Sequence, residues 1–364
     1  MDMIRGVNLG NWLVLEKWMH PDLFAGTSAE DETDLCIELG EKKHDVLREH
    51  RESYVTRADF EAIAAMGLTQ VRLPVPHFVF DDYEPYVGCI DYVDAALEWA
   101  QAAGLRLLID LHTAPDSQNG FDNGGICGVC KWHTKPENID RTVMVLEKLA
   151  ARYKNHPALF GIELLNEPVS EEVWNHAKQR YLPSDPERAK GSSYVPLETL
   201  VDFYERAYAA IRRHMDDEKA VMFHDGFRLK SWKDVMRGPE YRNVILDTHV
   251  YLGFALAGRD ASIADYMKLG LERTAADLAE MREFFPVVVG EWSLTHDPRA
   301  FGELTSVQRE AAARLVGSAQ LYVWEQADGW YFWSYKLLSD APHWDFRRVT
   351  ERGWLPRIGQ ASGV

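Results

Sequence analysis

The sequence is poor in cysteine and has no long hydrophobic run, and both shortages narrow the class of protein. Four cysteines in 364 residues are too few for a disulfide framework, so we expect reduced thiols. No apolar stretch approaches the roughly 20 residues that span a bilayer, and we expect no membrane span. The segment Met1–Arg5 shows no basic stretch followed by an apolar one, which leads us to expect a cytoplasmic protein without a secretory signal.

Basic residues are also in short supply. Fifty-seven acidic residues outnumber 40 basic ones, giving a formal charge of −17. A protein that binds phosphate backbones needs the opposite balance, so we expect no nucleic acid partner. A neutral substrate fits better, because a net field neither attracts nor repels it.

Several motifs of other chemistries are missing as well. The chain has no phosphate-binding glycine loop, no H-E-x-x-H helix and no G-x-S-x-G elbow. None of the predicted strands ends in a lysine suited to a Schiff base, which argues against an aldolase. We expect an enzyme that needs no metal or organic cofactor.

What the chain does have is a regular alternation of strands and helices. Such alternation predicts a parallel sheet, and eight repeats predict closure into a single (β/α)8 TIM barrel, an α/β fold. The predicted strands are Ile4–Asn8, Gln70–Pro74, Leu105–Leu111, Ala158–Leu165, Ala220–His224, Val244–His249, Val287–Gly290 and Trp330–Trp333. The predicted helices are Arg57–Met66, Tyr92–Ala103, Ile139–Tyr153, Leu197–Met215, Ile263–Glu283 and Val307–Gln326, with only a short or irregular helix in Phe227–Asn243.

No linker divides the chain, so residues 1–354 are predicted to form one catalytic domain, followed by a flexible tail at 355–364. Four long irregular segments follow strands, and in a barrel they would cover the C-terminal, catalytic face. These segments are Leu9–Tyr54, Thr113–Asn138, Pro168–Pro196 and Val250–Ala261.

Two glutamates end strands and suggest a definite chemistry. Glu167 follows the fourth strand in Asn166-Glu167-Pro168, and Glu291 ends the seventh in Gly290-Glu291-Trp292. Glycosidic bonds are broken by one carboxylic acid that protonates the leaving oxygen and one carboxylate across the sugar. If the two groups are roughly 5–5.5 Å apart, the second attacks the anomeric carbon and configuration is retained. The acid would need a raised pKa, and the nucleophile would stay ionised beside a cation such as Arg72.

Aromatic residues near the strand ends favour a sugar, whose apolar C–H faces stack on rings. Trp330 and Trp333 lie at the eighth strand, and Trp12 and Trp18 follow the first. On an alternating strand only one parity faces the barrel interior, so we expect Trp333 to reach the sugar and Trp330 to pack in the core.

These motifs resemble glycoside hydrolase family 5. Beyond the two glutamates, the segments Arg5–Trp18, Asp110–Gly125 and Gly329–Lys336 are similar to those of the exo-β-1,3-glucanase subgroup. The resemblance extends from Arg5 to about Trp354. It implies that Glu167 is the acid/base and Glu291 the nucleophile, with Arg72 beneath the nucleophile.

The resemblance also implies a set of residues that bind or support the sugar. Asn166 would hold the 2-hydroxyl, and His249 and Tyr251 would flank the glutamates, with Tyr251 donating towards Glu291. The remaining residues that would line the subsite of the cleaved sugar are Glu16, His112, Asp122, Asn123 and Trp333.

Some segments depart from the subgroup. Thr113 and Asp116 stand where glycine is usual, and Pro76-His77-Phe78 replaces an aromatic tail. We expect these changes at the rim, where they would alter the far end of the substrate. Cys127, Cys130 and His133 have the spacing of three zinc ligands but lack a fourth; a redox pair or two unligated thiols remain open, and we predict no metal.

The sequence therefore predicts a retaining β-glycoside hydrolase that is exo-acting on β-1,3-linked or other β-glucosides and works by double displacement through a glycosyl-enzyme. One alternative is an intracellular β-glucosidase of the same mechanism acting on glycolipid, aryl or β-1,4 glucosides. Another is a carbohydrate-binding barrel without catalytic activity, against which the presence of both glutamates argues. The oligomeric state is left open.

Overall fold

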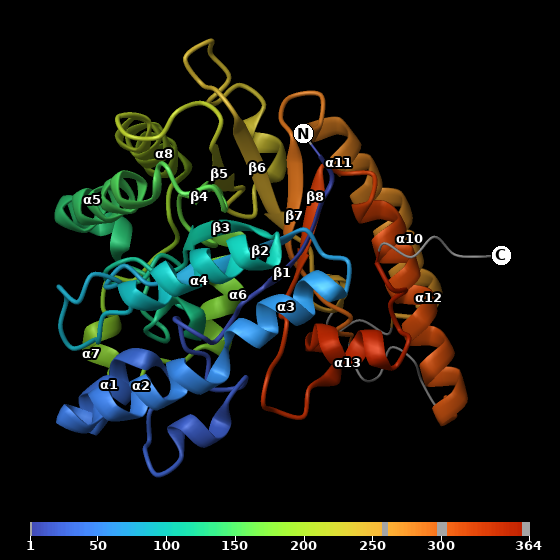
Figure 1. Ribbon diagram of the computed structural model, residues 1–364, viewed down its shortest axis with the longest axis horizontal. Coiled ribbons are helices and arrows are strands. Elements are labelled where there is room, and N and C mark those ends of the chain that lie inside the picture. Colours follow the sequence, from blue (N-terminus) through green and yellow to red (C-terminus); the bar gives the residue numbers. More distant parts are fainter. Residues whose placement is uncertain (1, 257–260, 297–303, 359–364) are drawn as a thin grey trace.

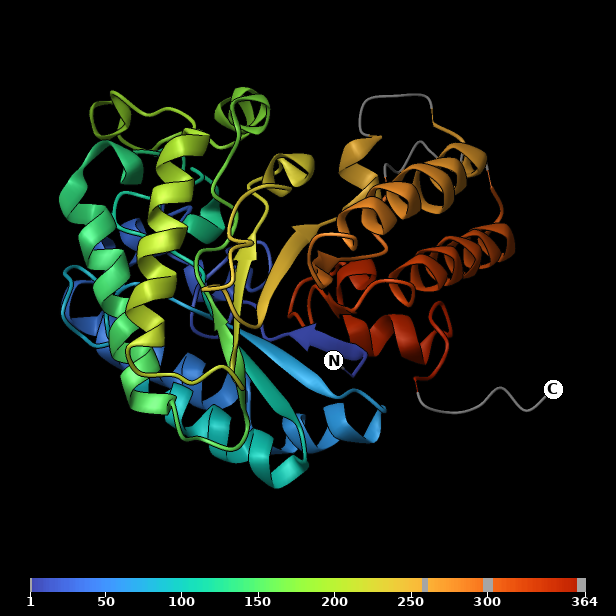
Figure 2. The same cartoon turned by 90° about the horizontal axis from the view of Figure 1, so that it is seen from above.

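A closed barrel of eight parallel strands forms the centre of the computed structural model, which describes residues 2–256, 261–296 and 304–358. The strands follow one another around the barrel in chain order, and β1 also pairs with β8. They are β1 (Ile4–Asn8), β2 (Gln70–Val75), β3 (Arg106–Leu111), β4 (Leu159–Glu163), β5 (Ala220–His224), β6 (Val244–His249), β7 (Val287–Trp292) and β8 (Gly329–Phe332). The TIM-barrel prediction is confirmed, and Figures 1 and 2 show the strands enclosed by helices.

Helices cover the outside of the barrel and enter the long connections. They are α1 (Glu32–Leu39), α2 (Lys43–Tyr54), α3 (Arg57–Ala65), α4 (Ile90–Ala103), α5 (Pro136–Tyr153), α6 (Glu171–Arg180), α7 (Pro186–Ala189), α8 (Leu197–Arg212), α9 (Leu252–Ala255), α10 (Ile263–Lys268), α11 (Ala275–Met281), α12 (Ser306–Trp324) and α13 (Phe346–Glu351). As the sequence predicts, only a short 3₁₀ turn, Leu229–Trp232, lies between β5 and β6.

Three of the predicted irregular segments contain whole α-helices, which corrects the sequence analysis. The segment after β1 holds α1 and α2, the segment after β4 holds α6 and α7, and the segment after β6 holds α9. Helices α1, α2 and α7 lie at the lower left of Figure 1, and α6 lies nearer its centre. The buried face of α2 includes His50 and Arg51, so this helix lacks the apolar periodicity on which the prediction relied. The predicted helix Ile263–Glu283 is divided into α10 and α11 by a π-helical turn at Leu269–Thr274.

An apolar plug fills the lower part of the barrel interior. It consists of eight buried side chains, and Gly6 leaves room for the Tyr331 ring, which would lie 2.3 Å from a Cβ at that position. The plug is formed by Ile4, Leu108, Phe160, Ala220, Met222, Ile245, Val288 and Tyr331. Because alternate residues of a strand face the same side, the next inward positions towards the C-terminal ends lie above this plug.

At the C-terminal end of the chain, Leu355 is buried against the core, and its amide donates to the carbonyl of Val349. The sequence analysis places Leu355 in the flexible tail, whereas the structure packs it against the core; residues 359–364 of that tail lie outside the described residues. Across the part of the chain that the structure describes, no helix is long and apolar enough to cross a bilayer.

Candidate active site

A buried polar layer lies directly above the apolar plug. Asn8, Arg72, Asp110, Glu163 and Asp247 are all fully buried, and they come from β1, β2, β3, β4 and β6. Four of them lie one inward step after a glycine or apolar residue on their strand, and Arg72 lies one inward step after Gln70. Buried charges are costly unless they are paired, so this layer must be built around its own counter-charges.

Arg72 is the cation at the centre of the layer. Its Nε and one terminal nitrogen donate to Glu163 at 2.7 and 3.2 Å, and the same terminal nitrogen lies 3.1 Å from Asp110. The other terminal nitrogen donates to Oε1 of Glu291 at 2.9 Å. The guanidinium therefore lies beneath Glu291, where the sequence analysis expected it, and it binds two further carboxylates that the sequence analysis did not assign.

Glu291 is held as an acceptor of hydrogen bonds. Besides Arg72, the hydroxyl of Tyr251 donates to Oε2 of Glu291 at 2.7 Å. Both partners are donors to a carboxylate, which favours its ionised form. Burial raises the pKa of Glu291, while the positive charges of His249 and Arg72 oppose that rise.

Glu167 reaches the barrel mouth from an unusual backbone conformation. It has a φ of +48°, in the left-handed region that non-glycine residues seldom adopt. Such a conformation costs free energy and tends to occur where function needs it. The carboxylate accepts hydrogen bonds from Nδ1 of His249 at 2.8 Å and from Nδ2 of Asn123 at 3.2 Å.

The imidazole of His249 joins the two glutamates. Its Nδ1 lies 2.8 Å from Oε1 of Glu167 and 3.5 Å from Oε2 of Glu291. The two carboxylate oxygens are therefore no farther apart than these two distances combined. This limit on one pair of facing oxygens is compatible with the roughly 5–5.5 Å spacing of the carboxyl groups in retaining pairs.

The pKa of Glu167 is lowered, whereas the sequence analysis expects a raised pKa for the acid. Burial would raise the pKa of Glu167, but the hydrogen bond and charge of His249, with help from His224 and Asn123, lower it to about 2. Burial acts against the charge of His249, yet Glu291, Asp247 and Glu167 together raise the pKa of His249 well above its usual value. These opposite pKa shifts favour the shared proton on His249 over Glu167.

A stacked imidazole and indole border the next part of the site. The rings of His112 and Trp333 lie 5.5 Å apart and within 9° of parallel. Asp110 faces Nδ1 of His112 at 2.5 Å, so Nε2 is left to accept from Nδ2 of Asn166 at 3.3 Å. Because Oδ1 of Asn166 accepts from Arg72, the orientation of this amide is determined on both sides.

The buried Glu16 and the partly buried Asp122 add two carboxyl groups to the same region. Burial, together with the charges of Asp122, Glu291 and Glu167, raises the pKa of Glu16, and burial raises that of Asp122 to about 6. Nε1 of Trp18 donates to Glu16 at 2.8 Å. The structure thus brings together the residues that we predicted for this site, namely Glu16, Arg72, His112, Asp122, Asn123, Asn166, Glu167, His249, Tyr251, Glu291 and Trp333.

Aromatic rings line the outer edge of the site. Trp344 contacts Trp18, Tyr251 and Phe254, with ring centroids 5.3, 5.2 and 5.9 Å away. The guanidinium of Arg180 lies 5.3 Å from the Phe254 ring, and 49% of Phe254 is exposed. These contacts connect the segments after β1, β4, β6 and β8.

Two tryptophans lie in the core rather than at the candidate site. Trp330 is fully buried in the core, and its indole nitrogen donates to Glu325, as its parity on β8 predicts. Trp12, which we had counted among the aromatic residues favouring a sugar, is also fully buried and donates to the carbonyl of Arg51. Its role is therefore in packing.

The departures from the family pattern are not all at the rim, which corrects the sequence analysis. Thr113 and His77 are buried, and the Thr113 hydroxyl accepts from the backbone amide of His77 at 3.0 Å. Asp116 has a φ of +57° and pairs with Lys135 and Asn138. A glycine at position 116 would adopt this backbone conformation without strain, so the aspartate serves to connect the loop to α5.

The cysteine-containing segment joins three loops. The amide of Cys127 donates to Asp31, and the amide of Cys130 donates to Ser192. Nε2 of His133 lies 3.0 Å from the hydroxyl of Ser193. Both thiols are free and buried, and burial raises their pKa values, which disfavours reactive thiolates.

Among the described residues, two groups of three side chains could hold a metal ion, and neither includes Cys127, Cys130 or His133. Both groups contain His249, whose two nitrogens already face Glu167 and Asp247. These carboxylates and imidazoles therefore belong to the hydrogen-bonded site described above.

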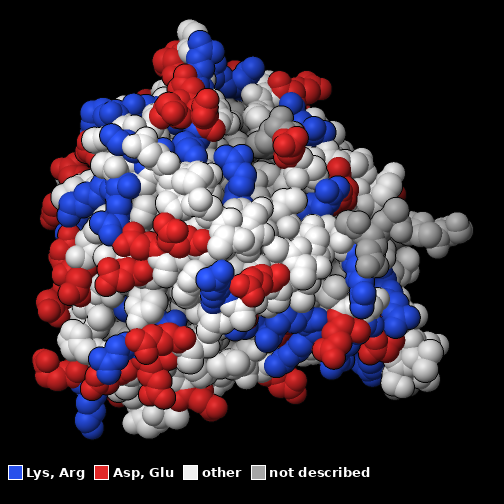
Figure 3. All heavy atoms as spheres, in the orientation of Figure 1, with Lys and Arg blue, Asp and Glu red and all other residues white. Residues whose placement is uncertain are grey.

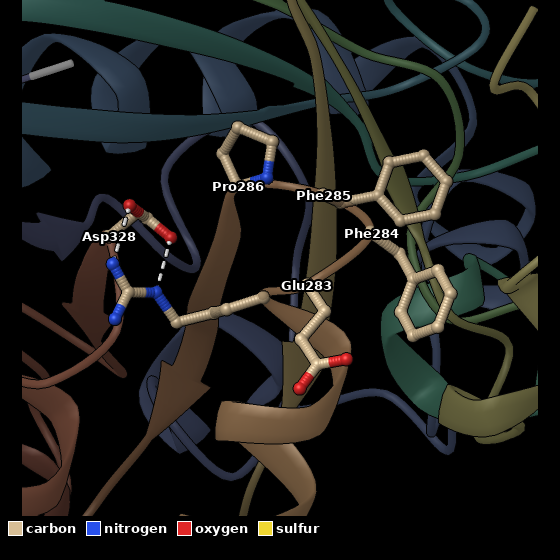
Figure 4. A pocket seen from close by; sticks show the side chains of 6 residues that line it. Glu283, Phe284, Phe285, Pro286 and Asp328 are labelled. Atoms are coloured by element: carbon tan, nitrogen blue, oxygen red, sulfur yellow. Dashed lines mark hydrogen bonds and ion pairs between the residues drawn. The ribbon is translucent and has the colours of Figure 1, made fainter.

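Two surface hollows lie elsewhere on the molecule. One, of about 290 Å³, lies before β7 and β8, where the guanidinium of Arg282 pairs with Asp328 and the rings of Phe284 and Phe285 point away from this pair (Figure 4). The other, of about 400 Å³, lies between α2 and α4 and includes Tyr92 and Trp99. The first is at the N-terminal end of the barrel, which usually serves stability rather than chemistry.

The surface does not suggest an anionic partner. On the face shown in Figure 3, acidic and basic side chains are interspersed. With a formal charge of −17, this distribution agrees with a neutral substrate.

Sequence reasoning missed the supporting carboxylates Asp110, Glu163 and Asp247. A usable signal is present in the sequence, since Asp110 and Asp247 each precede a predicted site histidine by two residues at the end of a strand. Residues two apart on extended chain face the same side. Glu163 precedes Glu167 by four residues, but the irregular backbone at Glu167 obscures that relation.

Known proteins resemble this chain in sequence and in fold. A family model described as cellulase (glycosyl hydrolase family 5) matches residues 40–337. A protein named probable glucan 1,3-beta-glucosidase A, from Aspergillus niger, is 34% identical over 97% of this chain and 87% of its own length. A glucan 1,3-beta-glucosidase of Candida oleophila is 31% identical over 98% of this chain and 89% of its own. The crystal structure of rutinosidase from Aspergillus niger superposes with a TM-score of 0.78 at 21% identity, covering 97% and 98% of the two chains.

Proposed function

The chain belongs to glycosyl hydrolase family 5 and is a retaining glycoside hydrolase, and we propose that it removes glucose from the non-reducing end of β-1,3-linked glucosides. In this proposal Glu291 is the nucleophile and Glu167 the acid/base. The observation that carries it is the shared contact of both carboxylates with Nδ1 of His249. That contact keeps the facing oxygens of the two carboxylates close together, as expected for enzymes in which one carboxylate attacks the sugar directly.

In the first step Glu291 attacks the anomeric carbon while the glycosidic oxygen leaves. The attacking oxygen belongs to the carboxylate of Glu291, which hydrogen bonds from Arg72 and Tyr251 hold in place. The C–O bond to the leaving group breaks as a proton passes from Glu167 to that oxygen, and a glucosyl ester of Glu291 remains.

The proton that Glu167 needs is one hydrogen bond away. Nδ1 of His249 faces Glu167 at 2.8 Å, and transfer along this bond leaves a neutral imidazole and a protonated Glu167. The low pKa of Glu167 beside charged His249 therefore does not prevent an acid role, because the proton stays within the pair. In the second step, ionised Glu167 takes a proton from water, which attacks the ester and releases the sugar.

The polar groups beside the glutamates support a neutral hexose as the cleaved unit. Asn166 and His112 supply hydrogen-bonding groups, and Trp333 supplies a ring face. Glu16 and Asp122 can accept from sugar hydroxyls. The names of the relatives from Aspergillus niger and Candida oleophila support glucose and a β-1,3 linkage.

A product analysis tests the proposal. The purified protein would be given laminarin, laminaribiose, cellobiose, gentiobiose, a glucosylceramide and an aryl β-glucoside, and the products would be followed by chromatography and by ¹H NMR of the first-formed anomer. We expect glucose as the first product from laminarin, released as the β-anomer, and a higher kcat/KM on laminaribiose than on the other disaccharides.

Other results would point elsewhere. Oligosaccharides as the first products of laminarin would contradict exo action, and a preference for cellobiose, the glycolipid or the aryl glucoside would contradict the β-1,3 linkage. Binding without turnover of any of these compounds would leave a carbohydrate-binding barrel as the better description.

A further inference from the structure

A bulge in β7 determines where the backbone of Glu291 lies. Along the ladder between β6 and β7, Asp247 pairs with Val288 and Thr248 with Val289, but His249 pairs with Glu291. Gly290 is thereby left outside the register, as in a β-bulge, a feature often found beside active sites. Its peptide groups need other partners because they are buried.

Two polar side chains satisfy this bulge. Oδ1 of Asp247 accepts from the amide of Gly290 at 2.7 Å, and Nδ2 of Asn8 donates to the Gly290 carbonyl at 2.9 Å. A Cβ at position 290 would lie 2.2 and 2.3 Å from the two carboxylate oxygens of Asp247. The carboxylate thus occupies the space that any other residue at position 290 would need.

The second oxygen of the same carboxylate faces the histidine between the glutamates. Oδ2 of Asp247 lies 3.0 Å from Nε2 of His249, while Nδ1 of that ring faces Glu167 and Glu291. The other titratable neighbour is His224, whose ring is 4.3 Å away, and Arg72 lies in the layer below. While Glu167 and Asp247 are both ionised, the imidazole can satisfy them together only by donating from both nitrogens, as a cation.

We propose that Asp247 is a positioning residue for the reaction, because its two oxygens join the cationic imidazole of His249 to the bulged backbone that carries Glu291. One side chain then sets both the place of the nucleophile and the charge state of the group that faces the acid/base. This inference rests on the roles proposed above for Glu167 and Glu291.

Replacing Asp247 by asparagine separates its contact with the Gly290 amide from its contact with His249. In Asp247→Asn the amide oxygen can still accept from Gly290, but the amide nitrogen would face Nε2 of His249 as a donor. His249 would then be held neutral. We expect kcat on an aryl β-glucoside to fall about 10- to 100-fold, the range for loss of a partner that orients a reacting group, with a much smaller change in KM.

The pH profile distinguishes this role from a purely structural one. Loss of the negative charge lowers the pKa of His249, and loss of the imidazolium charge raises that of Glu167. The limbs of the kcat/KM profile should therefore shift in Asp247→Asn by a unit or more. Asp31→Asn is a suitable control because Asp31 is also buried and accepts two backbone amides, from Asp34 and Cys127, in the loop before α1; its profile should match the wild type.

A measurement on the unaltered protein guards against misfolding of the variant. In ¹⁵N-histidine-labelled wild-type protein, His249, assigned by the loss of its signals in His249→Gln, should carry protons on both nitrogens at pH 7. A neutral His249 in the wild type, or an unshifted pH profile in folded Asp247→Asn, would overturn the inference. A wild-type protein without glycosidase activity would instead contradict the proposed function.

Discussion

The hydroxyl of Tyr251 donates a 2.7 Å hydrogen bond to Oε2 of Glu291, the oxygen that also lies 3.5 Å from Nδ1 of His249. This contact connects the segment after β6 to the end of β7. It fixes one oxygen of the carboxylate, while Arg72 fixes the other.

Replacing Tyr251 by phenylalanine removes this hydrogen bond and leaves the ring. A hydrogen bond to a charged group contributes about 1.5–3 kcal/mol, so we expect kcat to fall about 10- to 100-fold while the protein stays folded. Steady-state kinetics on laminaribiose, with circular dichroism as a folding check, measures this. Unchanged kcat would show that Tyr251 does not orient the nucleophile.

Glu291→Ala should lose turnover, because no covalent glucosyl intermediate can form. Added azide can enter the space of the missing carboxylate and attack the same face of the sugar, so we expect activity to return with an α-glucosyl azide as product. ¹H NMR of the product identifies the anomer. A β-azide would assign the nucleophile's role to another residue.

Glu167→Ala should affect substrates according to their leaving groups. A leaving group that needs no protonation should be little affected in the first step, whereas laminaribiose should lose about 10²- to 10⁴-fold, the usual contribution of general acid catalysis. The ratio of kcat/KM between 2,4-dinitrophenyl β-glucoside and laminaribiose measures the difference. Equal losses on both substrates would contradict an acid role.

The stability of the protein should depend on the ionisation of Glu32, which is fully buried at the start of α1. Burial raises its pKa to about 7, against the partial compensation of Arg51 and the Leu15 amide. An unfolded glutamate has a pKa of about 4.3, so the folded protein binds this proton more tightly. The stabilisation is therefore complete below about pH 4.3 and lost as the pH rises through 7.

Urea unfolding at pH 4.5, 6.0 and 7.5 tests this dependence. The wild type should lose more of its free energy of unfolding over that range than Glu32→Gln, whose side chain does not titrate. Glu61→Gln is the control, because Glu61 is exposed in its pair with Arg57. Parallel curves for the wild type and Glu32→Gln would show that Glu32 is ionised in the folded protein throughout.

The barrel could be predicted closely because its strands are apolar and short. Ile4–Asn8, Ala220–His224 and Val244–His249 are predicted with the bounds that the structure has. The helices α1 and α2 could not be predicted in the same way, since their buried faces include Glu32, His50 and Arg51. A polar side chain that is buried by pairing leaves no apolar signal in the sequence.

The candidate site shows a similar limit. The residues that end strands could be predicted as neighbours, because the ends of parallel strands meet on one face of a barrel. The charge state of Glu167 could not, because it depends on a histidine 82 residues away in the chain that touches both glutamates. The predicted cytoplasmic location stays a prediction.

The cysteine-containing segment has a consequence for how the specificity of such a barrel can change. Cys127 and Cys130 are bonded through their amides to Asp31 and Ser192, so the loops after β1, β3 and β4 are braced against one another. A chimera that receives only one of these loops from a relative would leave buried amides without partners in the other two. Exchange of linkage preference between such enzymes should therefore succeed when the three loops are grafted as a single cassette.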